Sequence, residues 1–363
     1  MPQANCRVLC LFMSILLLSW TLSGCQFSYK PYSPLPAAYS GNSDGCEATV
    51  IVPTLDSPTP QGKNVIWCGT FQLAYDKYKA LPGPVADFDD QDVGRRLNDS
   101  RMNPSDLPDN SYYAAAGWSK DGIVRKIQDD MAKKFPQVKV NLPQEGIEAI
   151  GYAYLAAAVK FRTAYFDREN GDEFVDSSGH KTRVSSFGLY KQHDAGVNET
   201  LADQIQVLYA GGGDFQPSEF VLDLDRNSKP SQLILACVEP KETLAATWQD
   251  VQRKIQQLKP TGGLEKFSQY DTLAVPNTAY RIEHHFKELE MVKGRRAYGA
   301  FQMVDFRLDR SGAVLASEAY FASLAGGRHF GFTHPFLIVM RKRGSNDPYF
   351  VMWVDNAELL CKR

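Results

Sequence analysis

The side chains that could catalyse a reaction or hold a metal ion are few and scattered in this sequence. Glu283-His284-His285 is the densest cluster among six histidines, but neighbouring side chains on a strand or helix point apart, whereas metal ligands must converge. The acidic pairs Asp89-Asp90 and Asp129-Asp130 fit a solvated surface. No Gly-x-Ser-x-Gly elbow occurs, and no lysine follows the triple glycine at 211–213 to bind a phosphate. We therefore expect a protein that is not an enzyme and needs no metal or cofactor, unless distant residues assemble a site in the fold.

The charge balance limits the possible partners. The chain of 363 residues carries 40 Lys and Arg against 42 Asp and Glu, a net charge of -2, and 44% of its residues are hydrophobic. A nucleic-acid binder with a basic face, or a disordered acidic chain, needs a lopsided count. Seven cysteines in a chain that can bury a large core also exclude a disulfide-held miniprotein. We expect a globular monomer with no nucleic-acid partner.

The N-terminal end has the pattern of a secretory signal peptide. One cation, Arg7, precedes an apolar run from Val8 to Leu18, which is too short for a stable membrane span. The run leads to Leu22-Ser23-Gly24-Cys25, which resembles the bacterial lipobox. That resemblance implies removal of residues 1–24 and acylation of Cys25, and several acyl chains anchor a protein stably. The alternative is an ordinary cleavage site beside a chance cysteine.

The next stretch predicts a tether. Residues 25–61 are rich in Ser, Pro, Gly, Asn and Thr and lack apolar periodicity, apart from a possible short strand at Ala48–Val52. Gln26 follows the lipobox cysteine where an Asp would retain the protein at the inner membrane, so the resemblance favours the outer membrane of the cell envelope. We expect residues 62–363 to form one domain.

Four cysteines remain in the exported chain. An oxidising compartment permits disulfides, and four cysteines allow three pairings among which the sequence does not choose. Buried free thiols are the alternative, and none of the four has metal-ligand spacing. These residues are Cys46, Cys68, Cys237 and Cys361.

Helix and strand patterns alternate in the first half of the predicted domain. Asn64–Ala80 begins like a strand and then becomes helical, and Asp121–Phe135 has apolar residues at helical spacing. Leu81–Asn110 is rich in Pro and Asp and is expected to be a surface loop. Glu148–Phe166 is apolar enough to be a buried strand or a helix, and periodicity does not separate the two.

The second half predicts mainly strands, with one helix at Leu244–Leu258. A Gly-Ser-Asn-Asp-Pro turn joins the last two strands into a hairpin. Runs of strands with helices grouped elsewhere indicate an α+β fold with a large, mainly antiparallel sheet, surrounding helices and a C-terminal β-hairpin. The predicted strands are Gln204–Tyr209, Phe220–Leu224, Leu233–Val238, Leu273–Pro276, Ala300–Leu308, Phe336–Arg341 and Tyr349–Val354.

The order of elements in the last third resembles the end of a serpin, a serine protease inhibitor. The strand Ala300–Leu308 leads through Asp309-Arg310-Ser311-Gly312 into the small residues of Ala313–Ala319, and a loop then precedes a Pro-Phe strand and the closing hairpin. The resemblance implies a serpin-like domain whose exposed loop is cleaved by a target protease and then inserts into the central sheet. Weaker likenesses in the family's order are Asn64-Val65-Ile66-Trp67, Phe161–Phe166, Gln206–Tyr209 and Val275-Pro276.

A loop that inserts into a half-buried sheet must present small or apolar residues at alternate positions, because a charge facing inward is costly to bury. The only charge in the segment, Glu318, falls on the face that could point outward. Insertion is therefore permitted, although Arg310 and Ser311 replace the acidic residues that the family prefers. The hinge residues that the resemblance implies are Gly312 and, on the face opposite Glu318, Ala313, Leu315, Ser317 and Ala319.

The sequence offers alternative positions for the cleaved bond. Family spacing places it near Gly326 and Gly327; Leu324 as the recognition residue would imply a chymotrypsin-like target, and Arg328 a target that cleaves after Arg. We expect a lipid-anchored, serpin-like inhibitor of serine or cysteine proteases. The alternative is a non-inhibitory binding or structural lipoprotein on the same scaffold, which the altered hinge favours.

Overall fold

The computed structural model describes residues 36–83, 92–142, 146–190, 195–211, 217–258, 266–289, 291–292, 295–296, 299–312 and 327–363. The predicted signal peptide and Cys25 lie outside these residues. So do the hinge residues Ala313, Leu315, Ser317 and Ala319, and the candidate cleavage-site residues Leu324 and Gly326.

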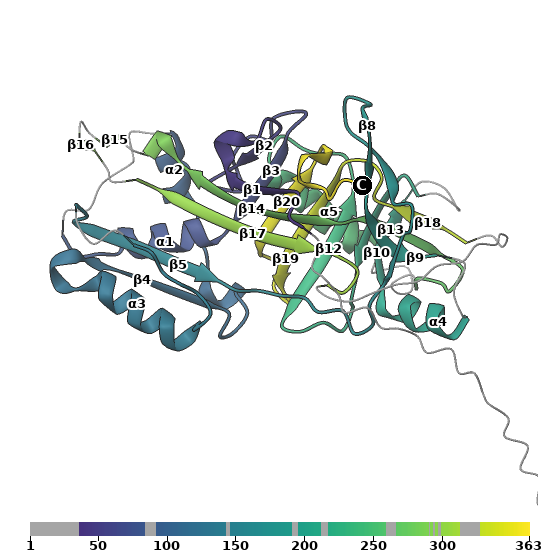
Figure 1. Cartoon of the computed structure of the whole chain (residues 1–363), viewed down its shortest axis with the longest axis horizontal. Helices are drawn as coiled ribbons and strands as arrows, with labels where there is room; N and C mark the ends of the chain where they lie inside the picture. The colour runs from purple at the N-terminus through teal and green to yellow at the C-terminus, as the bar shows by residue number, and fades with distance from the viewer. Residues whose placement is uncertain are drawn as a thin grey trace, which may run out of the picture. The chain divides into compact units, whose positions relative to one another are not determined.

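The described strands include a seven-stranded sheet at the centre of the core (Figure 1). It contains the predicted C-terminal hairpin, whose second strand is buried at every residue. Such continuous apolar runs occur where both faces of a sheet are covered. All neighbours are antiparallel except the last pair, which is parallel. In order, the strands are β10 (Gln206–Gly211), β11 (Glu219–Asp223), β12 (Ser231–Cys237), β19 (Phe336–Lys342), β20 (Pro348–Val354), β3 (Asn64–Cys68) and β2 (Thr49–Ile51).

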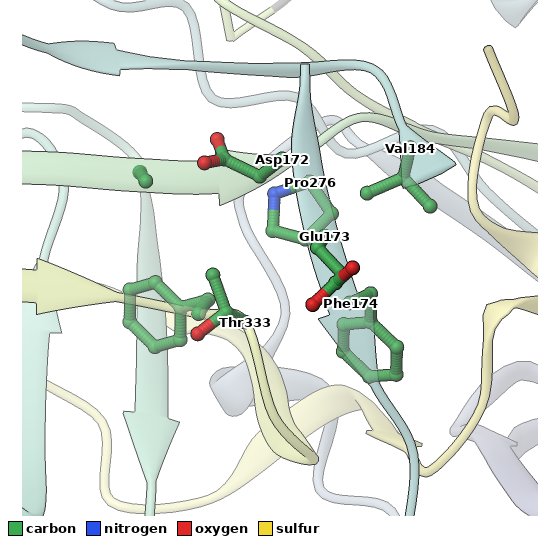
Figure 2. A pocket seen from close by; sticks show the side chains of 8 residues that line it. Asp172, Glu173, Phe174, Val184, Pro276 and Thr333 are labelled. Carbon is green, nitrogen blue, oxygen red and sulfur yellow. The ribbon is translucent and has the colours of Figure 1, made fainter. Parts of the chain in front are cut away.

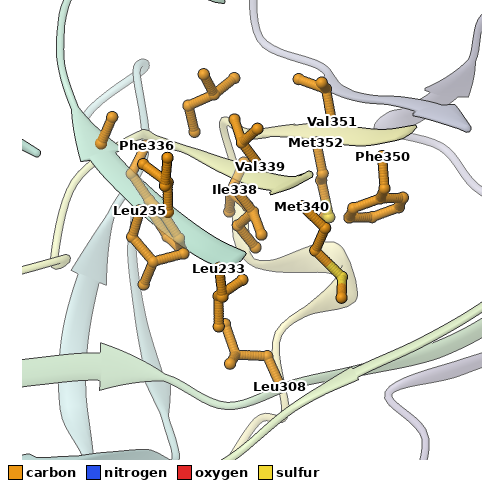
Figure 3. Close-up of a cluster of buried hydrophobic side chains, with 14 of the residues drawn as sticks. Leu233, Leu235, Leu308, Phe336, Ile338, Val339, Met340, Phe350, Val351 and Met352 are labelled. Atoms are coloured by element: carbon orange, nitrogen blue, oxygen red, sulfur yellow. The ribbon is translucent and has the colours of Figure 1, made fainter. Parts of the chain in front are cut away.

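A second sheet packs against this one. Strands β14 (Thr278–His285) and β17 (Phe301–Leu308) pair antiparallel over their full lengths, and alternate residues of β17 are buried. Phe306 of β17 stacks on Phe350 of β20 with ring centroids 4.7 Å apart. Figure 3 shows Leu308 at the end of β17 pointing into the cluster formed by β12, β19 and β20. The interface between the two sheets is therefore a large part of the core.

A four-stranded sheet contains two strands that precede strands of the first two sheets in the chain. β13 leads through one residue into β14, and β18 precedes β19. The pair β18–β13 is parallel, and the other pairs are antiparallel. In order, the strands are β18 (His329–Gly331), β13 (Thr272–Pro276), β9 (Ser186–Leu189) and β6 (Phe166–Asp167). The described two-stranded pairs are β4 (Tyr112–Trp118) with β5 (Ala149–Leu155), β7 (Asp172–Val175) with β8 (Lys181–Val184), and β15 (Met291–Val292) with β16 (Arg295–Arg296).

The helices of the described chain cover these sheets. α3 places Ile123, Ile127 and Met131 in a small separate core against β4 and β5, as its apolar spacing predicts. None of the described helices is long and apolar enough to cross a membrane. The α-helices are α1 (Thr70–Lys79), α2 (Asp92–Asp99), α3 (Ile123–Lys134), α4 (Ala195–Gln204) and α5 (Leu244–Leu258), and short 3-10 turns include η1 (Ser43–Gly45). The structure confirms the predicted α+β fold with mainly antiparallel sheets.

The prediction of a flexible tether over residues 25–61 is wrong from residue 36 onward. β1 (Tyr39–Asn42) pairs parallel with β14, and β2 pairs with β3, so the segment belongs to two sheets of the domain. The carboxylate of Glu358 accepts hydrogen bonds from the backbone nitrogens of Glu47 and Ala48 at 2.7 and 3.0 Å. β2 lies within the possible strand at Ala48–Val52. β1 was concealed by its polar composition, because backbone pairing does not require apolar periodicity.

The expected surface loop at Leu81–Asn110 is also partly wrong. It contains α2, and Leu97, Met102 and Leu107 from this stretch are buried in the main core. Glu148–Phe166, for which the sequence left strand and helix open, forms strand β5 followed by irregular backbone.

Candidate functional site

β5 and β17 each present an edge that no other described strand covers. β5 pairs only with β4, and β17 pairs only with β14. The two strands lie near each other, because α1 packs against both. Burial raises the pKa of Tyr154 on β5, and the Asp305 carboxylate on β17 raises it further. Figure 1 draws β5 and β17 along each other. Unpaired backbone N–H and C=O groups on such edges can accept a further strand.

The chain that follows each strand closes the space at one end. The backbone nitrogens of Phe161 and Tyr165 donate to the carbonyl oxygens of Ser311 and Arg310 at 3.2 and 2.7 Å. Residues 159–165 follow β5, and residues 309–312 follow β17. We call these two segments, with the free edges of β5 and β17, the β5/β17 junction.

The segment after β17 is a tight buried turn. Asp309, Arg310 and Ser311 are all less than 5% exposed, and the Asp309 carboxylate accepts hydrogen bonds from the backbone nitrogen and the hydroxyl of Ser311 at 3.0 and 2.6 Å. Gly312 ends the turn with φ +75°, and a Cβ there would lie 2.3 Å from the carbonyl oxygen of Val159. Only glycine satisfies both the left-handed backbone and this close approach. The structure thus places the predicted hinge residue Gly312 at the end of the junction.

The segment after β5 is anchored to the seven-stranded sheet. The fully buried carboxylate of Asp225 accepts hydrogen bonds from the backbone nitrogen of Arg162 at 2.9 Å and from its Nε at 3.3 Å. The side-chain amide of Gln204 pairs with both the N–H and the C=O of Thr163, at 2.8 and 3.0 Å. Tyr165 donates its hydroxyl to the carbonyl of Leu224 at 2.5 Å, and burial raises the pKa of this phenol, which keeps it a donor. Residues 161–165 therefore form a fixed wall against which the turn 309–312 rests.

Two arginines flank residues 313–326, and each pairs with an aspartate. Arg310 lies 3.0 Å from the carboxylate of Asp167 in β6, with only 5% of the Arg310 side chain exposed. Arg328 lies 2.7 Å from the carboxylate of Asp271, which is 3% exposed and directly precedes β13. The Asp271 carboxylate also accepts the backbone nitrogen of Arg328 at 2.8 Å.

This arrangement contradicts the prediction that Arg328 is a recognition residue on an exposed loop. Its guanidinium pairs with Asp271 and lies over the ring of Phe330 at 5.1 Å. Gly327 packs against the backbone of Tyr270 too closely for any side chain to fit. A protease must bind an extended, accessible segment, and Gly327 and Arg328 are not part of such a segment.

The other candidate sites do not converge. On β14, Glu283 is exposed. The Nδ1 atom of His284 forms a hydrogen bond with the Ser43 hydroxyl at 2.7 Å. The ring of His285 stacks on that of Phe301, with centroids 4.2 Å apart. The described residues hold no cluster of three side chains suited to a metal ion. Cys46, Cys68, Cys237 and Cys361 are free thiols, so the disulfide alternative is not seen. The pocket in Figure 2, at Asp172, Phe174, Val184, Pro276 and Thr333 among others, is too small to hold a water molecule.

Sequence reasoning identified the glycine but missed the acids that surround it. Asp167, Asp225 and Asp271 lie 143, 85 and 39 residues before Arg310 by subtraction of their residue numbers, so no local spacing links them to the hinge.

Comparison with known proteins gives a likeness in fold. No family model and no curated protein matches the sequence. Among similar solved structures, the thermophilic serpin Tengpin in its native state has a TM-score of 0.46 and 12% identity, covering 82% of this chain and 90% of that one. Serpin48 of the insect Tenebrio molitor has values of 0.43 and 12%, covering 81% and 92%. Human thyroxine-binding globulin has values of 0.46 and 10%, also covering 81% and 92%. At these identities the likeness concerns the fold alone.

Proposed function

We propose that this chain is a serpin-like protease inhibitor, held at the cell envelope by a lipid on Cys25, whose cleaved loop inserts as a strand between β5 and β17. The observation that carries the proposal is the pair of free strand edges at the β5/β17 junction. Residues 313–319, which sequence resemblance assigns to the inserting segment, directly follow Gly312 at the closed end of that junction.

The free energy for insertion would come from new pairing. A strand placed between β5 and β17 gains ladder hydrogen bonds on both sides, which neither edge makes with a described strand. Alternate small side chains would face α1 and the core, as the pattern of residues 313–319 allows. While the loop is intact, one of its ends is held at the β5/β17 junction and the other at β18. The free energy of insertion is therefore available only after one end is released.

The first experiment looks for a covalent complex. The mature protein is incubated with a panel of chymotrypsin-like, trypsin-like and cysteine proteases and resolved by SDS electrophoresis. The proposal predicts an SDS-resistant complex with at least one of them, because insertion traps the acyl-enzyme before hydrolysis. Cleavage into two fragments with every protease and no complex would contradict inhibition.

The second experiment separates insertion from simple binding. Ala319→Asp places a charge on the face predicted to turn inward, and Ala316→Asp places the same charge on the opposite face. The proposal predicts that the first variant loses inhibition while the second retains most of it, since only the first buries an unpaired charge. Equal behaviour of the two variants would rule out insertion in this register.

The lipid anchor has its own test. Cys25→Ala removes the only side chain that the lipobox resemblance assigns to acylation. We expect the wild-type protein in the outer-membrane fraction and the variant in the soluble periplasmic fraction, with unchanged inhibition. A membrane-bound variant would argue against lipidation at this residue.

The altered hinge favours a second candidate function. Arg310 and Ser311 are buried in a hydrogen-bonded turn, where the resembling family prefers acidic residues. A turn held this firmly would suit a non-inhibitory binding or structural lipoprotein on the same scaffold. The protease panel distinguishes the two functions.

A further inference from the structure

The chain enters the described domain beside its own last residues. The carbonyl oxygen of Pro36, the first described residue, lies 3.9 Å from the thiol sulfur of Cys361. Two residues later, the backbone nitrogen of Ala38 donates to the carbonyl of Ala279 in β14 at 2.6 Å. The segment that leads from Cys25 therefore meets the domain at the C-terminal end of the sequence.

Four exposed basic residues lie around this entry point. Arg307 in β17 is directly opposite Ala279 in the β14–β17 pair, and Lys362 and Arg363 are the last two residues of the sequence. The backbone nitrogen of Arg363 donates to the carbonyl of Arg183 in β8 at 3.2 Å, and Figure 1 marks the C-terminus beside β8. We call these four residues the C-terminal basic patch: Arg183, Arg307, Lys362 and Arg363.

None of the four side chains forms an ion pair with a carboxylate of the described chain. Arg183 donates to the carbonyl of Asn170 at 2.8 Å and Arg363 to the carbonyl of Arg168 at 2.9 Å, and both acceptors are neutral. The acids of the neighbouring strands form other pairs, which are Asp167–Arg310, Asp172–Arg168 and Glu173–Lys181. Exposed Glu169 and the terminal carboxylate lie beside the patch and leave it with a net positive charge.

The segment between Cys25 and Pro36 is short. Subtraction of the residue numbers gives eleven residue steps, which span at most about 40 Å when fully extended. A compact domain of about 330 residues has a radius of gyration of about 20 Å and is about 50 Å across. A lipid on Cys25 could therefore not turn the opposite face of the domain toward the membrane, so the face around Pro36 would lie nearest to it.

We propose that the C-terminal basic patch binds the anionic phospholipids of the membrane that holds the Cys25 lipid. The position of that membrane rests on the proposed function, whereas the binding itself depends on the four basic residues. Each basic residue close to an anionic bilayer strengthens binding about fivefold. The anchor makes this second contact intramolecular, so a weakly binding patch is enough to fix which face of the domain meets the membrane.

The first experiment measures the patch without the lipid. Residues 25–363 carrying Cys25→Ala are sedimented with vesicles of phosphatidylcholine, with and without phosphatidylglycerol, at low and at high salt. We expect binding at low salt only to the vesicles that contain phosphatidylglycerol, and loss of that binding at high salt, because salt screens exposed charges. Equal binding to both kinds of vesicle, or binding to neither, would overturn the proposal.

Two matched double substitutions locate the contact. Arg307→Gln with Lys362→Gln removes two patch charges and is expected to weaken binding about 25-fold, at about fivefold for each residue. Arg125→Gln with Lys133→Gln removes two exposed charges from α3, which Figure 1 shows away from the C-terminus. This control should stay within about twofold, because charges beyond a Debye length from the bilayer are screened.

Equal losses in the two double variants would show that net charge alone governs binding and would overturn the patch. If the first double variant does not fold, Arg183→Gln with Arg363→Gln decides, since it should show the same loss. Dextran sulfate is the competing soluble polyanion. If it binds the patch more tightly than the phosphatidylglycerol vesicles do, the surface recognises a soluble polyanion and the proposal fails.

Mass spectrometry of the wild-type protein tests the anchor separately. A lipid on Cys25, together with no preference for phosphatidylglycerol, would overturn the patch and leave the proposed function standing. An unmodified Cys25, together with the expected vesicle binding and its loss in the patch variant, would overturn the anchor and support the patch as a lipid-binding surface.

Discussion

Gly312 combines a left-handed backbone conformation with a position at the closed end of the β5/β17 junction. It is the first hinge residue that the sequence predicts, it has φ +75°, and it sits against the backbone of residues 159–161. A substitution here disturbs both the turn 309–312 and the wall that closes the junction.

Gly312→Ala is therefore expected to lower stability by about 3 kcal/mol or more, from the left-handed backbone and the close contact together. Gly344→Ala is the matched control, because Gly344 has φ +93° but nothing within 4 Å of its Cβ position. That control should lose only about 1–2 kcal/mol. Urea denaturation of the two variants measures the difference, and equal losses would show that Gly312 is not tightly packed.

Asp225 makes a second prediction at the residue scale. Asp225→Ala removes the acceptor of the Arg162 and Asn227 backbone nitrogens and is expected to cost about 2–4 kcal/mol, because the carboxylate is fully buried. Asp203→Ala, which removes a half-exposed carboxylate 3.1 Å from Arg226, should cost less than about 1 kcal/mol. Hydrogen exchange at residues 161–165 should rise in the first variant only. Unchanged protection there would mean that Asp225 does not hold the wall.

At the scale of the elements, β1 pairs with β14 at the edge of the β14–β17 sheet, and the turn η1 directly follows β1. The Ser43 hydroxyl and Nδ1 of His284 are 2.7 Å apart, and Lys287 pairs with Asp44 at 2.8 Å. Burial lowers the pKa of His284, although the nearby carboxylates of Glu288 and Asp44 partly oppose this. The neutral imidazole is therefore the form that the docked segment favours.

This gives a pH dependence with a definite sign. A histidine whose pKa is lower in the folded state contributes stability above its unfolded value of about 6.5, and that contribution is lost as the pH falls below it. Unfolding free energies measured from pH 8 to pH 5 should fall more steeply for the wild type than for His284→Gln. Parallel curves for the two proteins would contradict this role of His284.

Strands and helices with strong periodicity were predictable from sequence, whereas elements held by distant partners were not. Leu244–Leu258 is a helix over the whole predicted range, and Ala300–Leu308 is a strand within one residue. β1 was missed because its stability comes from pairing with β14, which is more than 200 residues away in sequence. The pairing of Arg328, one of the two alternatives for the recognition residue, was not visible for the same reason, since its partner Asp271 lies 57 residues earlier.

At the scale of the whole molecule, residues from several sheets take part in the proposed insertion. The seven-stranded sheet anchors residues 161–165, the four-stranded sheet holds Arg310 and Arg328, and β5 and β17 leave two edges free. The proposed function predicts that a strand placed between those edges stabilises the molecule.

The most direct test is the thermal midpoint of the mature protein before and after a single cleavage within residues 313–326. Strand insertion predicts a rise on the order of 10 °C. New pairing and burial contribute several kcal/mol, and each kcal/mol moves the midpoint by about 2 °C in a chain of this size. An engineered cleavage between Ser178 and Gly179, in the turn of the β7–β8 hairpin, is the control and should leave the midpoint unchanged or lower it. A midpoint that does not rise after loop cleavage would contradict strand insertion.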